Sequence, residues 1–338
     1  MLTIGYIGNG KSTNRYHLPF VLQRDQIKVK TIFQRKPEHE NWKRILGVKY
    51  TSDLNELLKD DEIKLIVVCT RQDSHFEYAK LVLEYNKNCL IEKPFMETSK
   101  QARKIFALAR EKGLLVQAYQ NRRFDSDFLT VQKVIEEGTL GDLLEIEMHY
   151  DYYRPEVPES THLYEPTCSY LYGHGCHTLD QVISYFGKPD NIHYDVRQLL
   201  GSGRMNDYFD LDLYYGRLKV SVKSSYFRLK ERPSFIVYGK KGCFIKETKD
   251  RQEEHLKMFY MPDNKDFGVD TVKQYGMITY VDESGTIHEE KVKSVMGDYG
   301  RVYDDLYEAI INGKDKTITD EQILLQMEIL EAGVKNLK

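Results

Sequence analysis

The chain has 338 residues, of which 41% are hydrophobic and 30% charged, and its formal net charge is −3. This length favours two domains, and the balanced charge gives no support to a nucleic-acid or polyanion binder. Five widely spaced cysteines exclude a disulfide scaffold, and the longest apolar run, residues 65–69, is too short to cross a bilayer. The N-terminus shows no signal peptide, so we expect a cytoplasmic protein without membrane contact.

Strand and helix patterns alternate over the first 120 residues. Strands are predicted at 2–7, 27–33, 65–69, 89–92 and 114–119, and helices at 53–59, 74–85 and 100–112, the last starting from Ser99. The run at 65–69 is apolar throughout, as in a parallel strand that is buried on both faces. The alternation predicts a parallel, doubly wound sheet.

The pattern changes after a further helix near 125–137. Stretches with a period of two are predicted as strands at 143–153, 191–199, 208–215, 217–227, 234–238 and 243–247. One helix near 175–186 interrupts them, and helices near 299–312 and 320–334 close the chain. This half predicts a large, mostly antiparallel open sheet with helices, and it divides the chain into domains at 1–122 and 123–338.

The glycine-rich segment after the first strand supports two interpretations. Counted from Gly5, the segment fits the phosphate-binding loop of nucleoside triphosphatases. In that loop Lys11 would contact the phosphates and Ser12 would bind magnesium. Counted from Gly8, it is a dinucleotide fingerprint in which Thr13 replaces the third glycine. The dinucleotide interpretation is favoured, because it keeps the whole strand 2–7 and because the strand at 65–69 lacks an acidic magnesium ligand. Pro19 predicts that the following helix starts near Leu18.

The end of the second strand bears on which dinucleotide binds. NAD-binding proteins usually carry an acid there to hold the ribose hydroxyl groups. This chain has Gln34, Arg35 and Lys36 instead, and the two cations could hold a 2′-phosphate. We therefore favour NADP(H) as the cofactor, with NAD(H) as the alternative, and a solvated basic turn is the alternative to both.

Two segments carry side chains suited to hydride transfer. Lys93 lies in the turn Glu92-Lys93-Pro94 at the end of a predicted parallel strand, where it could stabilise a substrate oxygen that gains negative charge. His177 opens the helix near 175–186 and could exchange the hydroxyl proton. His174, Cys176 and His177 also suggest zinc, but no second ligand pair lies at a suitable spacing, so no metal is expected.

Two further segments follow strand ends. Thr70 and His75 could flank the nicotinamide, although a helix cap explains that segment equally well. Arg122 and Arg123 could clamp a ligand or bridge the domains, and we favour the bridge for at least one of them.

With these residues in view, the chain resembles the Gfo/Idh/MocA oxidoreductases, and among them the YhhX-type subgroup. The resemblance covers essentially the whole chain. It rests on Gly8-Asn9-Gly10, His17-Leu18-Pro19, Thr70 with His75, Glu92-Lys93-Pro94, Asn121-Arg122-Arg123-Phe124, the segment 175–180, the segment 235–242 and the segment 299–303.

The resemblance implies a Rossmann domain followed by an α/β domain that binds substrate and forms a homodimer or homotetramer through its sheet. It implies catalytic roles for Lys93 and His177. Cofactor contacts are expected from Gly8, Asn9, Gly10, Lys11, Ser12, Thr13, Gln34, Arg35, Lys36, Cys69, Thr70, His75, Glu92, Lys93, Pro94 and Asn121. Substrate contacts are expected from Arg122, Tyr153, Arg154, Tyr164 and His174.

One position departs from the family pattern. Family dehydrogenases usually carry an aspartate four residues before the histidine, where this chain has Gly173. Asp180 is expected to face the helix packing, and Tyr153, Tyr164 or Tyr172 could compensate. The leading hypothesis is an NAD(P)-dependent oxidoreductase of a sugar, polyol or similar hydroxy or carbonyl compound. The alternatives are a dinucleotide-binding sensor with little turnover and a redox-assisted glycoside cleavage with tightly held NAD.

Overall fold

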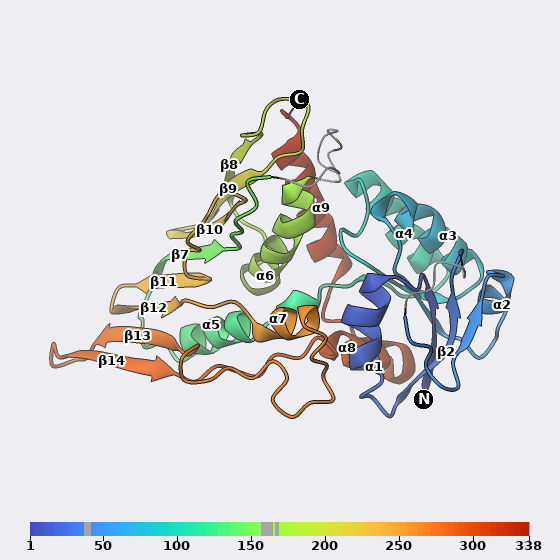
Figure 1. Ribbon diagram of the computed structural model, residues 1–338. Coiled ribbons are helices and arrows are strands. Elements are labelled where there is room, and N and C mark those ends of the chain that lie inside the picture. Colours follow the sequence, from blue (N-terminus) through green and yellow to red (C-terminus); the bar gives the residue numbers. More distant parts are fainter. Residues whose placement is uncertain (37–41, 157–164, 166–168, 338) are drawn as a thin grey trace. The chain divides into compact units, whose positions relative to one another are not determined.

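The computed structural model describes residues 1–36, 42–156, 165 and 169–337 (Figure 1). They form two compact units, each built from separate stretches of the chain. The first unit comprises Met1–Asn121, His255–Phe267 and Tyr299–Met327, and the second comprises Arg122–Glu254, Gly268–Asp298 and Glu328–Lys338. The division of roles between residues 1–122 and 123–338 stays a prediction.

The first unit contains a six-stranded parallel sheet in the order β3-β2-β1-β4-β5-β6. Its strands are β1 (Leu2–Ile7), β2 (Ile27–Phe33), β3 (Lys49–Thr51), β4 (Leu65–Val68), β5 (Asn88–Ile91) and β6 (Val116–Ala118). All neighbours in this order run parallel, so the predicted doubly wound sheet is confirmed. Strand β3 was not predicted, because three residues that include an exposed lysine give no apolar pattern.

Five helices of the first unit are α1 (Leu18–Val21), α2 (Asn55–Leu58), α3 (His75–Glu84), α4 (Ser99–Glu111) and α8 (Arg301–Asn312). α1 and α2 pack on β2, α3 packs on β4 and β5 beside α4, and α8 packs on β1 (Figure 1). The cap of α4 is Thr98 rather than the predicted Ser99. The Thr98 hydroxyl accepts from the Gln101 amide, and the Gln101 side chain accepts from the Thr98 amide.

The α-helix α1 begins at Leu18, as predicted, but helical backbone precedes it. The backbone is already helical at Lys11, and a wide π-helical turn over Thr13–His17 leads into α1. Pro19 then occupies the first turn of α1, where its missing N–H is tolerated. The helical backbone therefore begins directly after the glycine loop, and its regular α-helical part begins at Leu18.

The second unit contains an eight-stranded sheet in the order β14-β13-β12-β11-β7-β10-β9-β8. Its strands are β7 (Leu143–His149), β8 (Asn191–Arg197), β9 (Tyr208–Tyr215), β10 (Leu218–Ser225), β11 (Phe235–Gly239), β12 (Gly242–Lys246), β13 (Gly276–Val281) and β14 (Ile287–Val292). Only the β7–β10 pair is parallel, which confirms the mostly antiparallel prediction. β13, β14 and the short helix α7 (Arg251–Lys257) were not predicted.

The two faces of this sheet differ in character. Helix α5 (Ser126–Glu136) packs on β11 and β12, and helix α6 (Cys176–Phe186) packs on β10 (Figure 1). The opposite face carries cross-strand ion pairs such as Glu145–Lys219 at 2.6 Å. The last helix, α9, spans Asp320–Val334. The homodimer or homotetramer expected through the sheet stays a prediction.

Candidate cofactor and substrate sites

The glycine loop after β1 is shaped for close approach of a ligand backbone. Gly8 has φ +111°, and a Cβ built there would lie 2.3 Å from the carbonyl oxygen of Cys69. A Cβ on Gly10 would meet no atom within 4 Å. The first glycine is therefore required by the turn, while the second leaves open space beside the backbone. This division of roles fits a pyrophosphate at the start of a helix.

The structure argues against the triphosphatase interpretation. β1 runs through Gly5, which therefore lies inside the sheet rather than in a loop. A Cβ there would lie 2.6 Å from the Leu57 side chain, so packing explains this glycine. Ser12, which would bind magnesium in a phosphate loop, donates instead to the carboxylate of Glu92.

Side chains of the loop hold it in place. The hydroxyl of Thr13, which replaces the third glycine, donates to the Gly8 carbonyl oxygen at 2.7 Å. The Asn14 amide donates to the side chain of Asn9 and to the Gly10 carbonyl oxygen, both at 2.9 Å. Asn9 in turn donates to Gln34 at the end of β2, at 2.8 Å. The loop and the end of β2 are thus joined before any ligand binds.

The predicted cofactor side chains differ in exposure. Arg35 and Lys36 are exposed just beyond β2, while Gln34 is buried beside the loop. No carboxylate occupies positions 34–36, in keeping with the sequence argument for a 2′-phosphate. Lys11 is also exposed, at the start of the helix. The contact of Arg35 and Lys36 with a ribose 2′-phosphate stays a prediction.

His75 connects two turns at the ends of the strands. Its ring is fully buried, with Nδ1 3.0 Å from the Pro94 carbonyl oxygen and Nε2 3.1 Å from the Thr70 carbonyl oxygen. The ring therefore holds the turn after β4 against the turn after β5. The structure supports a positioning role for His75 rather than contact of its ring with the nicotinamide. Cys69 is buried at the same strand end, and Asn121, also buried, begins a short helical turn after β6.

Glu92 is the centre of a buried network under the Lys93 turn. Its carboxylate accepts from Ser12 and from the Lys93 amide at 2.9 Å, and it lies 3.0 Å from Nε2 of His17. Burial alone would raise the pKa of Glu92, but His17, the Lys93 charge and Ser12 outweigh it and lower the pKa to about 2. Glu92 is thus a fixed anion that ties the glycine loop to the turn carrying Lys93. The Lys93–Pro94 peptide bond is cis.

Aromatic side chains surround His17 on its other side. Its Nδ1 lies 2.6 Å from the Tyr303 hydroxyl, which is 3.0 Å from the Tyr6 hydroxyl. The Tyr119 ring stacks on the imidazole with centroids 3.9 Å apart. Tyr303 comes from α8, almost 300 residues from Tyr6, so its part in the network could not be read from the sequence.

His177 lies in the second unit and lines a small cavity of about 10 Å³, room for roughly one water. The side chain is 6% exposed and sits at the start of α6, after a π-helical turn over Leu171–Gly175. Two carboxylates, Asp125 and Asp127, line the same cavity. Titratable groups therefore surround the predicted acid/base residue even without an aspartate at position 173.

Gly173 is not required by the backbone. A Cβ built there would meet nothing within 4 Å, and its φ is not positive. A Cβ is therefore tolerated at this position, so neither the backbone nor a clash at Cβ explains the departure from the family pattern. Asp180 is held by Arg123 at 2.7 and 2.8 Å, which confirms that it faces the helix packing. Among the tyrosines expected to compensate, Tyr172 is buried, and Tyr164 lies outside the described residues.

The two arginines after β6 are both engaged in ion pairs. Arg123 pairs with Asp180, and both belong to the second unit, so this bridge does not join the domains as predicted. Arg122 pairs with Asp125 at 3.3 Å and with Glu253 at 3.1 Å, and it lines the His177 cavity. Contact of Arg122 with substrate stays a prediction.

Predicted substrate residues lie at a cluster of aromatic rings. The His174 ring centroid lies 4.6 to 6.1 Å from the ring centroids of four tyrosines, Tyr150, Tyr152, Tyr170 and Tyr226. The Lys249 ammonium lies 5.0 Å from the Tyr150 ring centre and 4.9 Å from that of Tyr152. The Arg154 guanidinium lies 4.8 Å from the Tyr152 ring centre, and Tyr153 is 53% exposed beside them.

Five members of this cluster are not among the predicted substrate residues: Tyr150, Tyr152, Tyr170, Tyr226 and Lys249. Tyr226 follows β10 and Lys249 follows β12, and neither stands in a motif. Burial raises the pKa of Tyr226 to about 12, so its phenol is protonated near neutral pH and can donate a hydrogen bond. A surface of rings and hydroxyl groups suits a sugar or polyol.

Asp127 yields a testable dependence of stability on pH. Burial, and next the neighbouring Asp250, raise its pKa from 3.8 to about 7. The folded protein therefore holds this proton more tightly than the unfolded chain, so the stabilisation is fully present below about pH 4 and is lost as the pH rises to about 7. Asp127→Asn is expected to match the wild type near pH 4 and to exceed its unfolding free energy above pH 7 by a few kcal/mol at most.

Chemical denaturation at a series of pH values measures this difference. Asp25→Asn, at an exposed carboxylate, is the matched control and should show no such growing difference. A constant difference between Asp127→Asn and wild type across the range would contradict the assignment.

Neither a metal cluster nor a membrane span is found in the described part of the chain. No three His, Cys, Asp or Glu side chains there gather closely enough to hold a metal ion. No helix there is long and apolar enough to cross a bilayer.

Comparison with known proteins places this architecture in a family. The sequence model of the oxidoreductase family's NAD-binding Rossmann fold (GFO_IDH_MocA) matches residues 2–120. The model of its C-terminal alpha/beta domain matches residues 132–338.

Individual relatives span nearly the whole chain. The uncharacterized oxidoreductase YhhX of Escherichia coli K12 is 48% identical over 98% of this chain and 96% of its own length. A crystal structure of a probable oxidoreductase yhhX covers 100% of this chain and 98% of that chain with a TM-score of 0.94. An oxidoreductase structure from Bacillus cereus is 44% identical, with a TM-score of 0.92 over 99% of this chain and 96% of that one.

A relative with a named activity is more distant. The scyllo-inositol 2-dehydrogenase (NADP(+)) IolW of Bacillus subtilis 168 is 30% identical over 100% of this chain and 94% of its own length. Both family models and the full-length relatives therefore agree with the two-sheet fold described above. The chain belongs to the Gfo/Idh/MocA oxidoreductase family.

Proposed function

We propose that this oxidoreductase transfers hydride between NADP(H) and a small hydroxy or carbonyl compound, with a sugar or polyol as the substrate class. The observation that carries the proposal is the Glu92 network, in which a buried anion joins the glycine loop to the Lys93 turn. A cofactor at the loop and a substrate oxygen at Lys93 would then be positioned by one rigid element. The tyrosine cluster around His174 supports the substrate class.

The roles of the two catalytic residues follow from their chemistry. The nicotinamide, when bound, supplies the acceptor or donor of the hydride. In the oxidative direction the Lys93 ammonium stabilises the negative charge that develops on the substrate oxygen. His177 takes the hydroxyl proton as the C–H bond breaks, and it returns a proton in the reverse direction. Asp125 and Asp127 line the cavity beside His177, and they are the carboxylates that would pass this proton on.

The preference for NADP(H) rests on the end of β2. Arg35 and Lys36 are exposed cations beside the loop, and no carboxylate stands there to hold a ribose hydroxyl. The relative IolW, whose name specifies NADP(+), is consistent with this choice.

A dinucleotide-binding sensor with little turnover is the second candidate. Gly173 favours it, because the chain lacks the carboxylate that family dehydrogenases carry there, although a Cβ at this position would meet no atom within 4 Å. Such a sensor would bind the dinucleotide but would not catalyse hydride transfer. Cofactor affinity alone therefore does not separate the two candidates, whereas turnover does.

A titration with NADPH and NADH, followed by cofactor fluorescence, tests the proposal. Wild type is expected to bind NADPH at least about tenfold more tightly, and Arg35→Ala is expected to remove most of that preference, because one charged hydrogen bond to phosphate is lost. Lys28→Ala, at an exposed lysine within β2, is the matched control.

Other results would redirect the assignment. Equal affinities of the wild type for the two cofactors would defeat the NADP preference. Weak binding of both would defeat the oxidoreductase proposal. Tight NADPH binding without turnover across a panel of sugars, polyols and their carbonyl forms would favour the sensor.

A further inference from the structure

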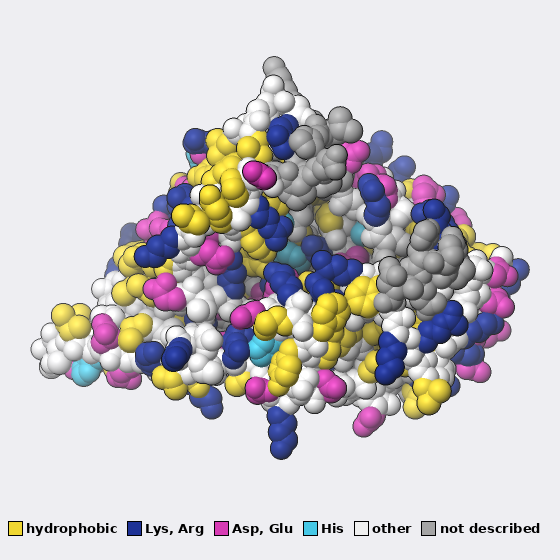
Figure 2. Space-filling view, viewed as in Figure 1, with side chains coloured by type: hydrophobic (Ala, Val, Ile, Leu, Met, Phe, Trp, Pro, Cys, Tyr) yellow, Lys and Arg dark blue, Asp and Glu magenta, His cyan; other side chains and the backbone are white. Residues whose placement is uncertain are grey.

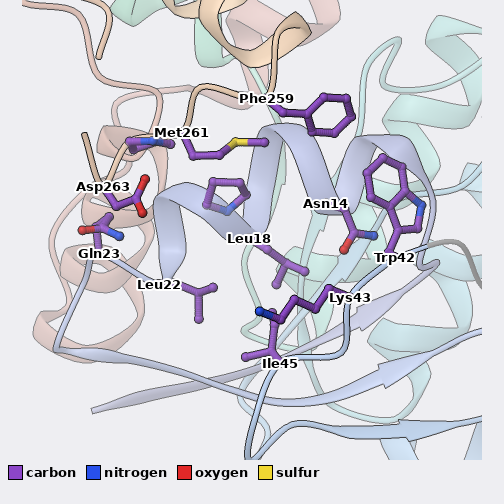
Figure 3. A pocket seen from close by; sticks show the side chains of 12 residues that line it. Asn14, Leu18, Leu22, Gln23, Trp42, Lys43, Ile45, Phe259, Met261 and Asp263 are labelled. Carbon is purple, nitrogen blue, oxygen red and sulfur yellow. The ribbon is translucent and has the colours of Figure 1, made fainter. Parts of the chain in front are cut away.

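A second pocket lies in the first unit, away from the motifs discussed so far. Figure 2 shows hydrophobic side chains gathered over the face that carries α1, where Leu22 is 51% and Phe259 54% exposed. Within this face is a pocket of about 320 Å³, formed by α1 and by the segments 42–45 and 259–263 (Figure 3). This volume is in the range of small-molecule sites.

One end of the pocket is aromatic. Trp42 and Phe259 lie side by side there, with ring centroids 6.1 Å apart (Figure 3). The Arg15 guanidinium lies over the Phe259 ring, 4.8 Å from its centre. Phe259 has φ +58°, a left-handed conformation that is costly for a bulky side chain. Such strain is often found where a side chain is held to clamp a ligand.

The middle of the pocket is aliphatic. Leu18, Leu22, Ile45 and Met261 line it, together with two prolines. A ligand that covered these side chains would remove apolar surface from water, which is favourable at about 25 cal/mol per Å². The pocket therefore favours an occupant with a sizeable apolar body, and its aromatic end favours a ring.

Two opposite charges border the apolar surface. Figure 3 shows Lys43 running beside Ile45 toward Leu22, and Asp263 on the far side near Gln23. Within the described residues, neither Lys43 nor Asp263 forms an ion pair. A ligand with one anionic and one cationic group would pair with both side chains, whereas an uncharged ligand would leave both charges without a partner from the ligand.

We propose that this pocket binds a small aromatic zwitterion of the size of an aromatic amino acid. Its ring would pack against Trp42 and Phe259, its carboxylate would pair with Lys43, and its ammonium would pair with Asp263. The Asn14 amide, which also lines the pocket, donates to the Gly10 carbonyl oxygen. The pocket and the glycine loop therefore share a residue, although the proposal does not depend on the function of the loop.

Trp42 is the only tryptophan in the chain, so its fluorescence reports on this pocket alone. The probe is L-phenylalanine, which does not interfere with selective excitation of tryptophan. We expect a saturable change in Trp42 emission. Phenethylamine lacks the carboxylate and phenylacetate lacks the ammonium, and each is expected to bind about tenfold more weakly, the value of one charged contact.

Substitutions of the two charged residues test which group of the ligand each of them binds. Lys43→Ala should abolish the preference for phenylalanine over phenethylamine, and Asp263→Ala the preference over phenylacetate. Lys265→Ala, at an exposed lysine outside the pocket lining, is the matched control and should change neither. These side chains are exposed, and thermal melts would verify that the variants fold.

Three results would overturn the proposal. The first is an absence of saturable change with all three probes. The second is equal behaviour of Lys43→Ala and Lys265→Ala. The third is competition between phenylalanine and NADPH for one site, which would make the pocket part of the dinucleotide site.

Discussion

Lys93→Ala and His177→Ala are each expected to lower kcat at least about a hundredfold while NADPH affinity changes by less than about threefold. Lys93 supplies a cation to an oxygen whose charge grows during hydride transfer, so its loss acts on the transition state more than on binding. His177 supplies the proton acceptor, and it belongs to the second unit, whereas the glycine loop belongs to the first. Steady-state kinetics with an active substrate, combined with cofactor titration, measures both quantities.

Matched variants separate a catalytic effect from a general one. His288→Ala, in the β13–β14 hairpin, and Lys112→Ala, at an exposed lysine after α4, should keep wild-type turnover. Imidazole added to His177→Ala should restore part of the rate, because a free base can then accept the proton. Normal kcat in either catalytic variant would refute the assigned roles, and a parallel loss of cofactor affinity would indicate a structural defect.

The sequence predicts the elements that have a clear hydrophobic pattern. β1 and β2 were predicted at 2–7 and 27–33, and the structure has the same bounds, because β1 is buried at nearly every position and β2 places apolar residues between its two lysines. β14 and α7 were not predicted because their residues are mostly charged or polar and show no hydrophobic pattern. Ile287–Val292 reads IHEEKV and Arg251–Lys257 reads RQEEHLK. Their positions depend on neighbours in the fold rather than on their own pattern.

The candidate site divides in the same way. Gly8, Lys93 and His177 stand in local motifs, and backbone conformation or strand ends explain their positions. Other side chains of the two units are held by partners from far along the chain, as His17 is by Tyr303 and Arg123 is by Asp180. Such pairs require the tertiary fold, because no sequence spacing records which buried side chains will meet.

The glycine loop provides the second large effect. Gly8→Ala is expected to destabilise the protein by several kcal/mol, because alanine is strained at φ +111° and its Cβ would lie 2.3 Å from a carbonyl oxygen. Gly10→Ala is expected to keep the wild-type melting temperature, because its Cβ meets no protein atom within 4 Å. It should nevertheless weaken NADPH binding at least about tenfold, because the methyl group takes the space that the pyrophosphate needs.

The two glycine variants separate an effect on stability from an effect on cofactor affinity. A thermal melt and a cofactor titration on each variant give four results, and only one pattern fits the proposed site: loss of stability at Gly8 and loss of affinity alone at Gly10. Wild-type NADPH affinity in Gly10→Ala would mean that the phosphates do not approach this loop. The open space beside Gly10 would then need another occupant, and the dinucleotide would have to bind elsewhere in the first unit. A wild-type melting temperature in Gly8→Ala would contradict the geometry of the turn itself.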